Sequence, residues 1–296
     1  MGRKKRSTPD MIFDVSNTTV LTIILIIVAY PLYFVLISSI SDPDLVNSGK
    51  IWFWPEGLSF DGYKRVFQSP DIIIGYRNSL IYTIAGTSLN LLLTLPAGYA
   101  LSRKDLKGRK VVMLFMLITM YFSGGLIPTY LLVKNLGMLN SIWALIIPNA
   151  ISVWNIIIAK TFFESNLPDE LLESAAIDGC SNRRYFISIA IPLSKALIAV
   201  TALFYAVGHW NSYFNALIYL KDTGKYPLQL VLRNILVLDQ ANAAMIKDQT
   251  IVRELQRLAE AIKYPIIIVA CLPVLVLYPF LQKYFTKGVL IGSIKG

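Results

Sequence analysis

The chain has 296 residues, of which 55% are hydrophobic and only 16% are charged. Soluble domains carry about 25% charged residues, so this composition excludes an ordinary soluble domain and indicates an integral membrane protein. The net charge of +10 would suggest nucleic-acid binding in a soluble chain, but basic loops on the cytosolic side of a membrane explain it better. The single histidine, His209, excludes a histidine-cluster metal site and disfavours a Ser-His-Asp triad.

Six apolar segments are long enough to cross the hydrocarbon core of a bilayer, which takes about 20 helical residues. The first follows a basic segment, residues 1–17, and its apolar run is too long for a secretory signal. The predicted spans are residues 18–40, 78–101, 111–133, 141–159, 194–220 and 261–285. The sequence therefore predicts an all-α membrane protein with six transmembrane helices, ending in a tail of residues 286–296.

Basic residues predict the orientation of these spans. They cluster at residues 3–6, before the first span, and at 103–110, after the second, whereas the short connection after the third span has only Lys134. Because basic residues in short loops stay in the cytosol, both termini are expected to be cytosolic. The polar insert 164–193, between the fourth and fifth spans, then lies on the same side.

This insert has the signals of two short helices. Pro168, Asp169 and Glu170 favour a helix start, and Gly179 favours its end. Ser181 can cap a second helix that runs toward the fifth span. The pattern by itself fits either an ordinary amphipathic connector or a docking site for a partner, for which small and charged side chains are suited.

The residues Glu-Ser-Ala-Ala-Ile-Asp-Gly at 173–179, followed by Ile-Pro-Leu at 191–193, resemble the EAA loop of the permease subunits of ABC-type importers. Blocks at 122–130, 136–140, 208–217 and 287–296 are similar to the carbohydrate-uptake branch of that family, especially to the second permease subunit of maltose and alginate or oligosaccharide importers. One departure is Ser174, where the family's loop usually has alanine. The resemblance assigns coupling to an ATPase to one set of residues: Glu173, Ser174, Ala175, Ala176, Asp178 and Gly179.

The resemblance also implies the partners of a bacterial cell-membrane complex. These are a second homologous permease, a dimer of P-loop ATPase subunits that bind ATP and Mg, and an extracellular or periplasmic solute-binding protein that delivers a saccharide. The chain has no Gly-x-x-x-x-Gly-Lys-Ser/Thr phosphate loop, so it is expected to be a non-catalytic subunit without a cofactor or metal of its own. By the same resemblance, Ser293, Lys295 and Gly296 would reach between the ATPase domains; a frayed basic terminus is the alternative.

The fifth span combines aromatic and amide side chains, which suit the apolar faces and polar rims of sugar rings. The candidates for the substrate path are Trp210, Asn211, Tyr213 and Asn215, with Asn149 of the fourth span. Interhelical hydrogen bonds and an aromatic interface belt are the alternative reading. No acidic residue lies deep in a predicted span, which argues against an ion-coupled secondary carrier. That carrier, an ABC permease for a non-sugar solute and a membrane scaffold remain alternatives to a saccharide importer.

Overall fold

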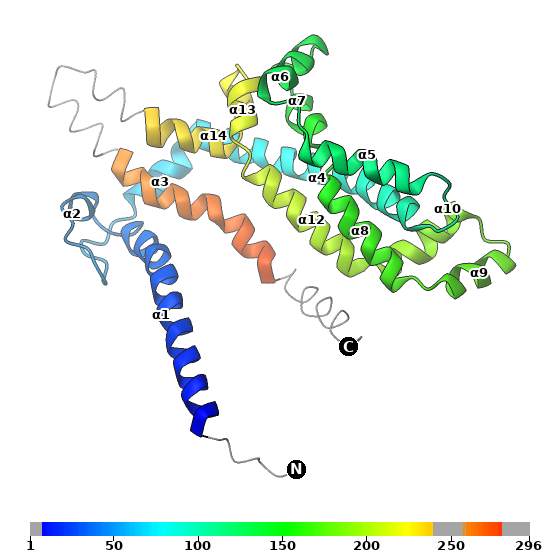
Figure 1. Cartoon of the computed structure of the whole chain (residues 1–296). Helices are drawn as coiled ribbons and strands as arrows, with labels where there is room; N and C mark the ends of the chain where they lie inside the picture. The colour runs from blue at the N-terminus through cyan, green and yellow to red at the C-terminus, as the bar shows by residue number, and fades with distance from the viewer. Residues whose placement is uncertain (1–7, 239–256, 258, 280–296) are drawn as a thin grey trace. The chain divides into compact units, whose positions relative to one another are not determined.

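The computed structural model describes residues 8–238, 257 and 259–279 (Figure 1). Every regular element in that part of the chain is helical, which confirms the predicted all-α class. The chain divides into two compact units, Met1–Ser69 with Ile235–Cys271, and Pro70–Asn234 with Leu272–Gly296.

The first unit contains a long apolar helix whose surface is almost entirely exposed. Its helices are α1 (Thr8–Ser38), α2 (Pro43–Asn47) and α3 (Asp61–Gln68), together with most of the helix Ala259–Pro279. The loop after α1 is fastened to the helix end, because the Tyr30 hydroxyl donates to the Trp52 carbonyl at 3.2 Å and that of Tyr33 donates to Phe53. Leucine, isoleucine and valine side chains cover α1 on all sides and are exposed, as expected for a helix that faces lipid.

The second unit is built around α4 (Pro70–Ser102), which α8 (Val153–Asn166) and α12 (Lys195–Trp210) pack against (Figure 1). Its 33 residues correspond to a length of about 50 Å, more than the hydrocarbon core of a membrane. The predicted span 78–101 therefore covers only part of this helix. Pro96 lies within α4 without ending it, which membrane helices tolerate.

Within the described part of the chain, three helices are long and apolar enough to cross a membrane, and three bent helix pairs could each be one broken span, which gives up to six. The pairs are α5 (Arg109–Tyr121) with α6 (Leu126–Asn135), bent by 111°; Trp143–Asn149 with α8, bent by 50°; and Asn182–Leu193 with α12, bent by 81°. Trp143–Asn149 comprises α7 (Trp143–Ile146) and the 3-10 turn η1 (Ile147–Asn149). Each of the predicted spans 111–133 and 141–159 therefore contains a break in its helix. At the first break, Gly125 has a φ of +85°, which side-chain-bearing residues rarely adopt.

The predicted helix 194–220 is also interrupted. α12 ends at Trp210 and α13 (Phe214–Tyr219) begins after a short non-helical stretch. Asn211 caps the end of α12, since both its backbone N–H and its side-chain amide donate to the Val207 carbonyl, at 3.1 and 3.0 Å. The last predicted span, 261–285, begins as expected within Ala259–Pro279, and its end lies outside the described residues.

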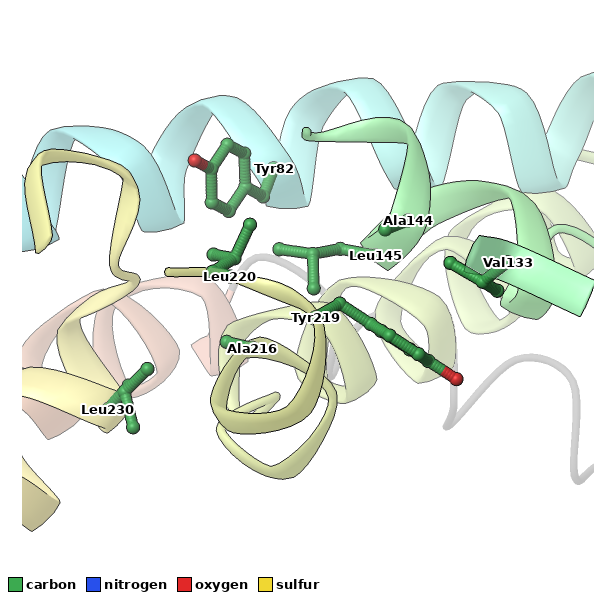
Figure 2. Close-up of a cluster of buried hydrophobic side chains, with 8 residues drawn as sticks. All are labelled: Tyr82, Val133, Ala144, Leu145, Ala216, Tyr219, Leu220 and Leu230. Carbon is green, nitrogen blue, oxygen red and sulfur yellow. The ribbon is translucent and has the colours of Figure 1, made fainter. Parts of the chain in front are cut away.

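A hydrophobic cluster joins α4 to the segments after these breaks (Figure 2). Ala216, Tyr219 and Leu220 of the α13 region lie next to Ala144 and Leu145 of α7. Tyr82 of α4 belongs to the same cluster. The chain continues through η3 (Thr223–Lys225), α14 (Leu228–Arg233) and η4 (Asn234–Leu238). Backbone carbonyls of residues 224–226 accept hydrogen bonds from Asn78 and Tyr82, at 2.8 to 3.1 Å, so this loop is tied to α4.

Candidate functional site: a docking loop and a polar cavity

The docking loop, residues 164–193, folds locally as its sequence predicts. α9 (Asp169–Ile177) begins just after Pro168, and two hydrogen bonds close its end: Gly179 N–H to the Ala176 carbonyl at 3.0 Å and Cys180 N–H to the Ala175 carbonyl at 2.9 Å. This pair of bonds defines a Schellman motif, which needs a left-handed residue at its turn, and Gly179 has a φ of +71°. The loop then forms α10 (Asn182–Tyr185), the π-helical turn η2 (Phe186–Ala190) and α11 (Ile191–Leu193), with the Ser181 hydroxyl accepting from Arg184 N–H as predicted.

α9 has one packed face and one exposed face. Leu171, Leu172 and Ala175 pack into a core cluster formed with α4, α8 and α12. On the opposite face Ile177 is 87% exposed. The predicted coupling residues Glu173, Ser174, Ala176, Asp178 and Gly179 are exposed too. Ala175 is the exception, because its small side chain serves packing within this chain and cannot face a partner.

Ser174 does not disturb this helix. Its hydroxyl donates to the Leu171 carbonyl at 3.0 Å, so the extra polar group is satisfied within α9. The serine at this position therefore adds no unsatisfied polar group to α9.

Basic residues of the loop after α4 hold the docking loop by ion pairs. Lys104 Nζ lies 2.5 Å from Asp169 Oδ2, and Glu164 pairs with Lys160 at 2.7 Å and with Arg109 at 3.5 Å. Of these groups, Lys104, Arg109, Glu164 and Asp169 border a cavity of about 610 Å³. The hydrogen bond from Lys104 to Asp169 raises the pKa of Lys104. From the sequence, Lys104 and Arg109 indicated only the orientation of the spans.

An aromatic cluster lies directly under the docking loop. The ring of Tyr99, on α4, has its centroid 4.9 Å from that of Phe186, 5.8 Å from that of Phe163 and 6.2 Å from that of Tyr185. Gly98, the residue before Tyr99, allows α4 and α8 to approach each other closely, since a Cβ there would lie 2.5 Å from the Ala159 Cβ. The docking loop is thus packed onto the end of α4 through large, well-contacted side chains.

A second cavity, of about 490 Å³, lies between the start of α8 and the end of α12. It contains four of the five predicted substrate-path residues, Asn149, Asn211, Tyr213 and Asn215. Its other described lining residues are Ile151, Ser152, Asn155, Phe204, Tyr205, Gly208, His209, Ser212 and Phe214. None of these lining residues is acidic, lysine or arginine, so the described wall offers amides, hydroxyls and aromatic faces.

Trp210 does not line this cavity. It is only 4% exposed and packs edge-on against Tyr76, with ring centroids 5.5 Å apart. Trp210, predicted as a substrate-path residue, is therefore a packing contact between α12 and α4 in this structure. Conversely, Ser152, Asn155 and Tyr205 were not predicted, because they come together only through the break before α8.

The remaining sequence predictions concern a metal site, which was not expected, and the C-terminal tail. Among the described residues no group of three or more His, Cys, Asp or Glu side chains could hold a metal ion. Ser293, Lys295 and Gly296 lie outside the described residues.

The fold and the amphipathic docking loop define an all-helical, multi-pass membrane protein, and comparison with known proteins gives its family. The family model described as "Binding-protein-dependent transport system inner membrane component" matches residues 71–291. The chain belongs to this family, whose members are the permease subunits of ABC transporters.

Relatives and one solved structure agree with this membership over nearly the whole chain. Protein LplC of Bacillus subtilis is 42% identical over 96% of this chain and 95% of its own length. The polygalacturonan/rhamnogalacturonan transport system permease protein YtcP of the same organism is 41% identical over 96% of this chain and 99% of its own. The structure is similar to a crystal structure of a bacterial ABC transporter involved in the import of the acidic polysaccharide alginate, with a TM-score of 0.86, 30% identity, and coverage of 96% of this chain and 100% of that one.

Proposed function

We propose that this chain is the permease subunit of an ATP-driven, binding-protein-dependent importer of saccharides, with oligosaccharides as its substrates. The exposed ridge of α9 carries this proposal. A helix whose inner face is packed into the bundle and whose outer face shows Glu173, Ala176 and Ile177 to solvent is suited to transmit force from a partner. Two relatives are named as permeases of transport systems for polygalacturonan/rhamnogalacturonan and for maltodextrin, and these names support a saccharide substrate.

In this proposal the chain forms half of a translocation path. A homologous permease supplies the other half, two P-loop ATPase subunits bind ATP and Mg beneath the docking loops, and a solute-binding protein delivers the saccharide outside the cell. With six spans, both termini and the docking loop would lie in the cytosol, as the distribution of basic residues predicts. The tail residues Ser293, Lys295 and Gly296 are proposed as a further contact with the ATPase.

The cavity between α8 and α12 is proposed as part of the substrate path, with Asn149, Asn211, Tyr213 and Asn215 among its contacts. Amide groups can both donate to and accept from sugar hydroxyls, and the Tyr213 ring, 44% exposed as a residue, offers a face to the apolar side of a sugar ring. ATP-driven closure of the ATPase dimer would favour one of two arrangements of the bundle and so change the access to this cavity.

Reconstitution tests this function. The chain is expressed with its partner subunits, purified, placed in vesicles, and assayed for ATP hydrolysis with a binding protein and oligosaccharides from polygalacturonan, maltodextrin and arabinan. Stimulation by at least one saccharide, with its uptake, is expected. Ile177→Ser should lower co-purification of the ATPase without reducing the amount of folded permease, because Ile177 makes little contact within the chain. Co-purification that is unaffected by Ile177→Ser and Glu173→Ala would contradict docking on α9. The absence of stimulation by any saccharide would contradict the proposed substrate class.

A further inference from the structure

One buried side chain, Asn90 of α4, contacts both walls of the polar cavity. Its Nδ2 group donates to the Asn149 carbonyl at 2.7 Å and to the Ala150 carbonyl at 2.8 Å, and its Oδ1 atom lies 2.7 Å from His209 Nε2. Asn90 is 0% exposed. Since both amide protons go to carbonyl oxygens, the orientation of the amide is fixed by its partners, and His209 Nε2–H must be the donor to Oδ1.

These hydrogen bonds lie where the helices are interrupted. Asn149 is the last residue of η1 and Ala150 is the first residue of the break before α8, where carbonyl groups have lost their helical partners. His209 belongs to the last turn of α12. A buried carbonyl without a partner is costly, so the break depends on a donor from elsewhere. Gly86, one turn before Asn90, leaves the space that the His209 ring occupies, since a side chain there would overlap the imidazole.

Thr94, one turn after Asn90, makes a parallel connection. Its hydroxyl lies 2.7 Å from the Tyr205 hydroxyl of α12, which accepts from Ser152 N–H at 3.2 Å. Thr94 is 0% exposed and Tyr205 is 7% exposed. Asn90 therefore ties residues 149 and 150 on one wall to α12 on the other, and Thr94 holds the Tyr205 hydroxyl that bonds directly to Ser152.

We propose that Asn90, with Thr94 as its second contact, is the positioning residue of the cavity and sets the separation of its two walls. α4 itself also meets the docking loop, at Tyr99, whose ring packs on Tyr185 and Phe186 about 14 Å along the helix from Asn90. Displacement of the docking loop therefore reaches the cavity through α4. Since the cavity is a substrate path only by the function proposed above, this role in transport depends on that proposal, whereas the positioning of the walls can be measured without a substrate.

Thiol labelling in membrane vesicles that contain the whole transporter tests this role. In a background with Cys180→Ser and Cys271→Ala, a cysteine is placed at Asn211 in the cavity or, as a control, at Leu136, which is 61% exposed and lies outside the cavity and the docking loop. Its rate of modification by a small methanethiosulfonate reagent is measured. Asn90→Leu is expected to change the rate at residue 211 by at least about fivefold, the ratio that corresponds to about 1 kcal/mol, and to leave the rate at residue 136 unchanged.

A matched pair of threonine substitutions distinguishes loss of the proposed contact from a general effect on folding. Thr94→Val removes the hydroxyl that contacts Tyr205, whereas Thr87→Val removes a buried hydroxyl on the same helix that has no hydrogen-bond partner in the described structure. Only Thr94→Val should change labelling at residue 211. Equal rates for the parent, Asn90→Leu and Thr94→Val would overturn the proposal, as would equal effects of Thr94→Val and Thr87→Val. Protection of residue 211 by oligosaccharides tests the substrate path separately: its absence, with rates that still depend on Asn90, would refute the path and retain the positioning role.

Discussion

Gly179 ends the docking helix in a conformation that glycine adopts without strain, so its replacement measures how far coupling depends on that turn. Its φ is +71°, and a Cβ built there meets no atom within 4 Å. The cost of Gly179→Ala within this chain therefore comes from the backbone alone, and is about 1–2 kcal/mol for an alanine in the left-handed region. Asparagine tolerates that region better and should cost less.

A cost of about 1–2 kcal/mol lowers the ratio of closed to opened turn by about 5- to 30-fold. If docking needs the closed turn, the ratio of saccharide taken up to ATP hydrolysed should fall in the order Gly, Asn, Ala. The assay is transport and ATP hydrolysis in the same vesicles. Gly137→Ala is the matched control, since Gly137 also has a positive φ, +68°, and open space around its Cβ, but lies outside the docking loop.

Two results would refute this reasoning. Gly179→Ala with the parent ratio of uptake to hydrolysis would show that the turn is not needed for coupling. Equal losses in Gly179→Ala and Gly137→Ala would show a general effect of backbone strain on the permease.

Three further predictions concern the packing and charge of the second unit. Gly98→Val should destabilise the purified permease by about 1–3 kcal/mol in thermal unfolding, because its Cβ would lie 3.1 Å from the Lys160 backbone, whereas Gly208→Ala, with open space, should not. Trp210→Ala should lower stability by about 3–5 kcal/mol, with an unchanged order of saccharide preference among the molecules that remain folded. The hydrogen bonds from Arg103 lower the pKa of Asp105, so the pair's contribution is present above the ordinary aspartate pKa and is lost as pH falls through the lowered one. Carboxyl NMR titration should find that Arg103→Gln raises the pKa of Asp105, and an unchanged midpoint would contradict that cause.

The docking loop could be predicted well because its structure is set by local chemistry. Pro168, Gly179 and Ser181 each act within one turn of their own position, and the structure confirms the helix, its end and the second cap. Which face of α9 is buried could not be predicted from the sequence of the loop. Ala175 and Ala176 are the same residue type, and only contacts with the ends of α4 and α8 decide that the first is buried.

The spans were harder, because hydropathy measures apolar length and not continuity. Residues 111–133 contain no charged residue, yet Gly124 and Gly125 lie between α5 and α6. The cavity depended on such a break and could be predicted only in part. Asn149 and Asn211 were found from composition, but Asn155 and Tyr205 line the cavity because the chain bends between Trp143–Asn149 and α8.

The sequence of α4 contains a pattern from which the face that packs against other helices could have been predicted. Small or polar residues recur at every fourth position, and all six are buried: Asn78, Tyr82, Gly86, Asn90, Thr94 and Gly98. In an apolar helix this spacing marks the face that packs on other helices rather than on lipid.

This face fixes the register of α4 more than it adds to stability. An interhelical hydrogen bond within a membrane protein is worth about 0.6 kcal/mol on average, so the bonds of Asn78, Asn90 and Thr94 sum to a modest free energy. A shift of α4 by one helical turn, about 5.4 Å, would however unpair all of them at once and drive a side chain into the His209 ring. Sliding of α4 past α12 is therefore disfavoured, and motion driven from the docking loop should carry α4 and the attached cavity wall as one body. The flexibility needed for transport then resides in the three bent helix pairs, where the backbone is already interrupted.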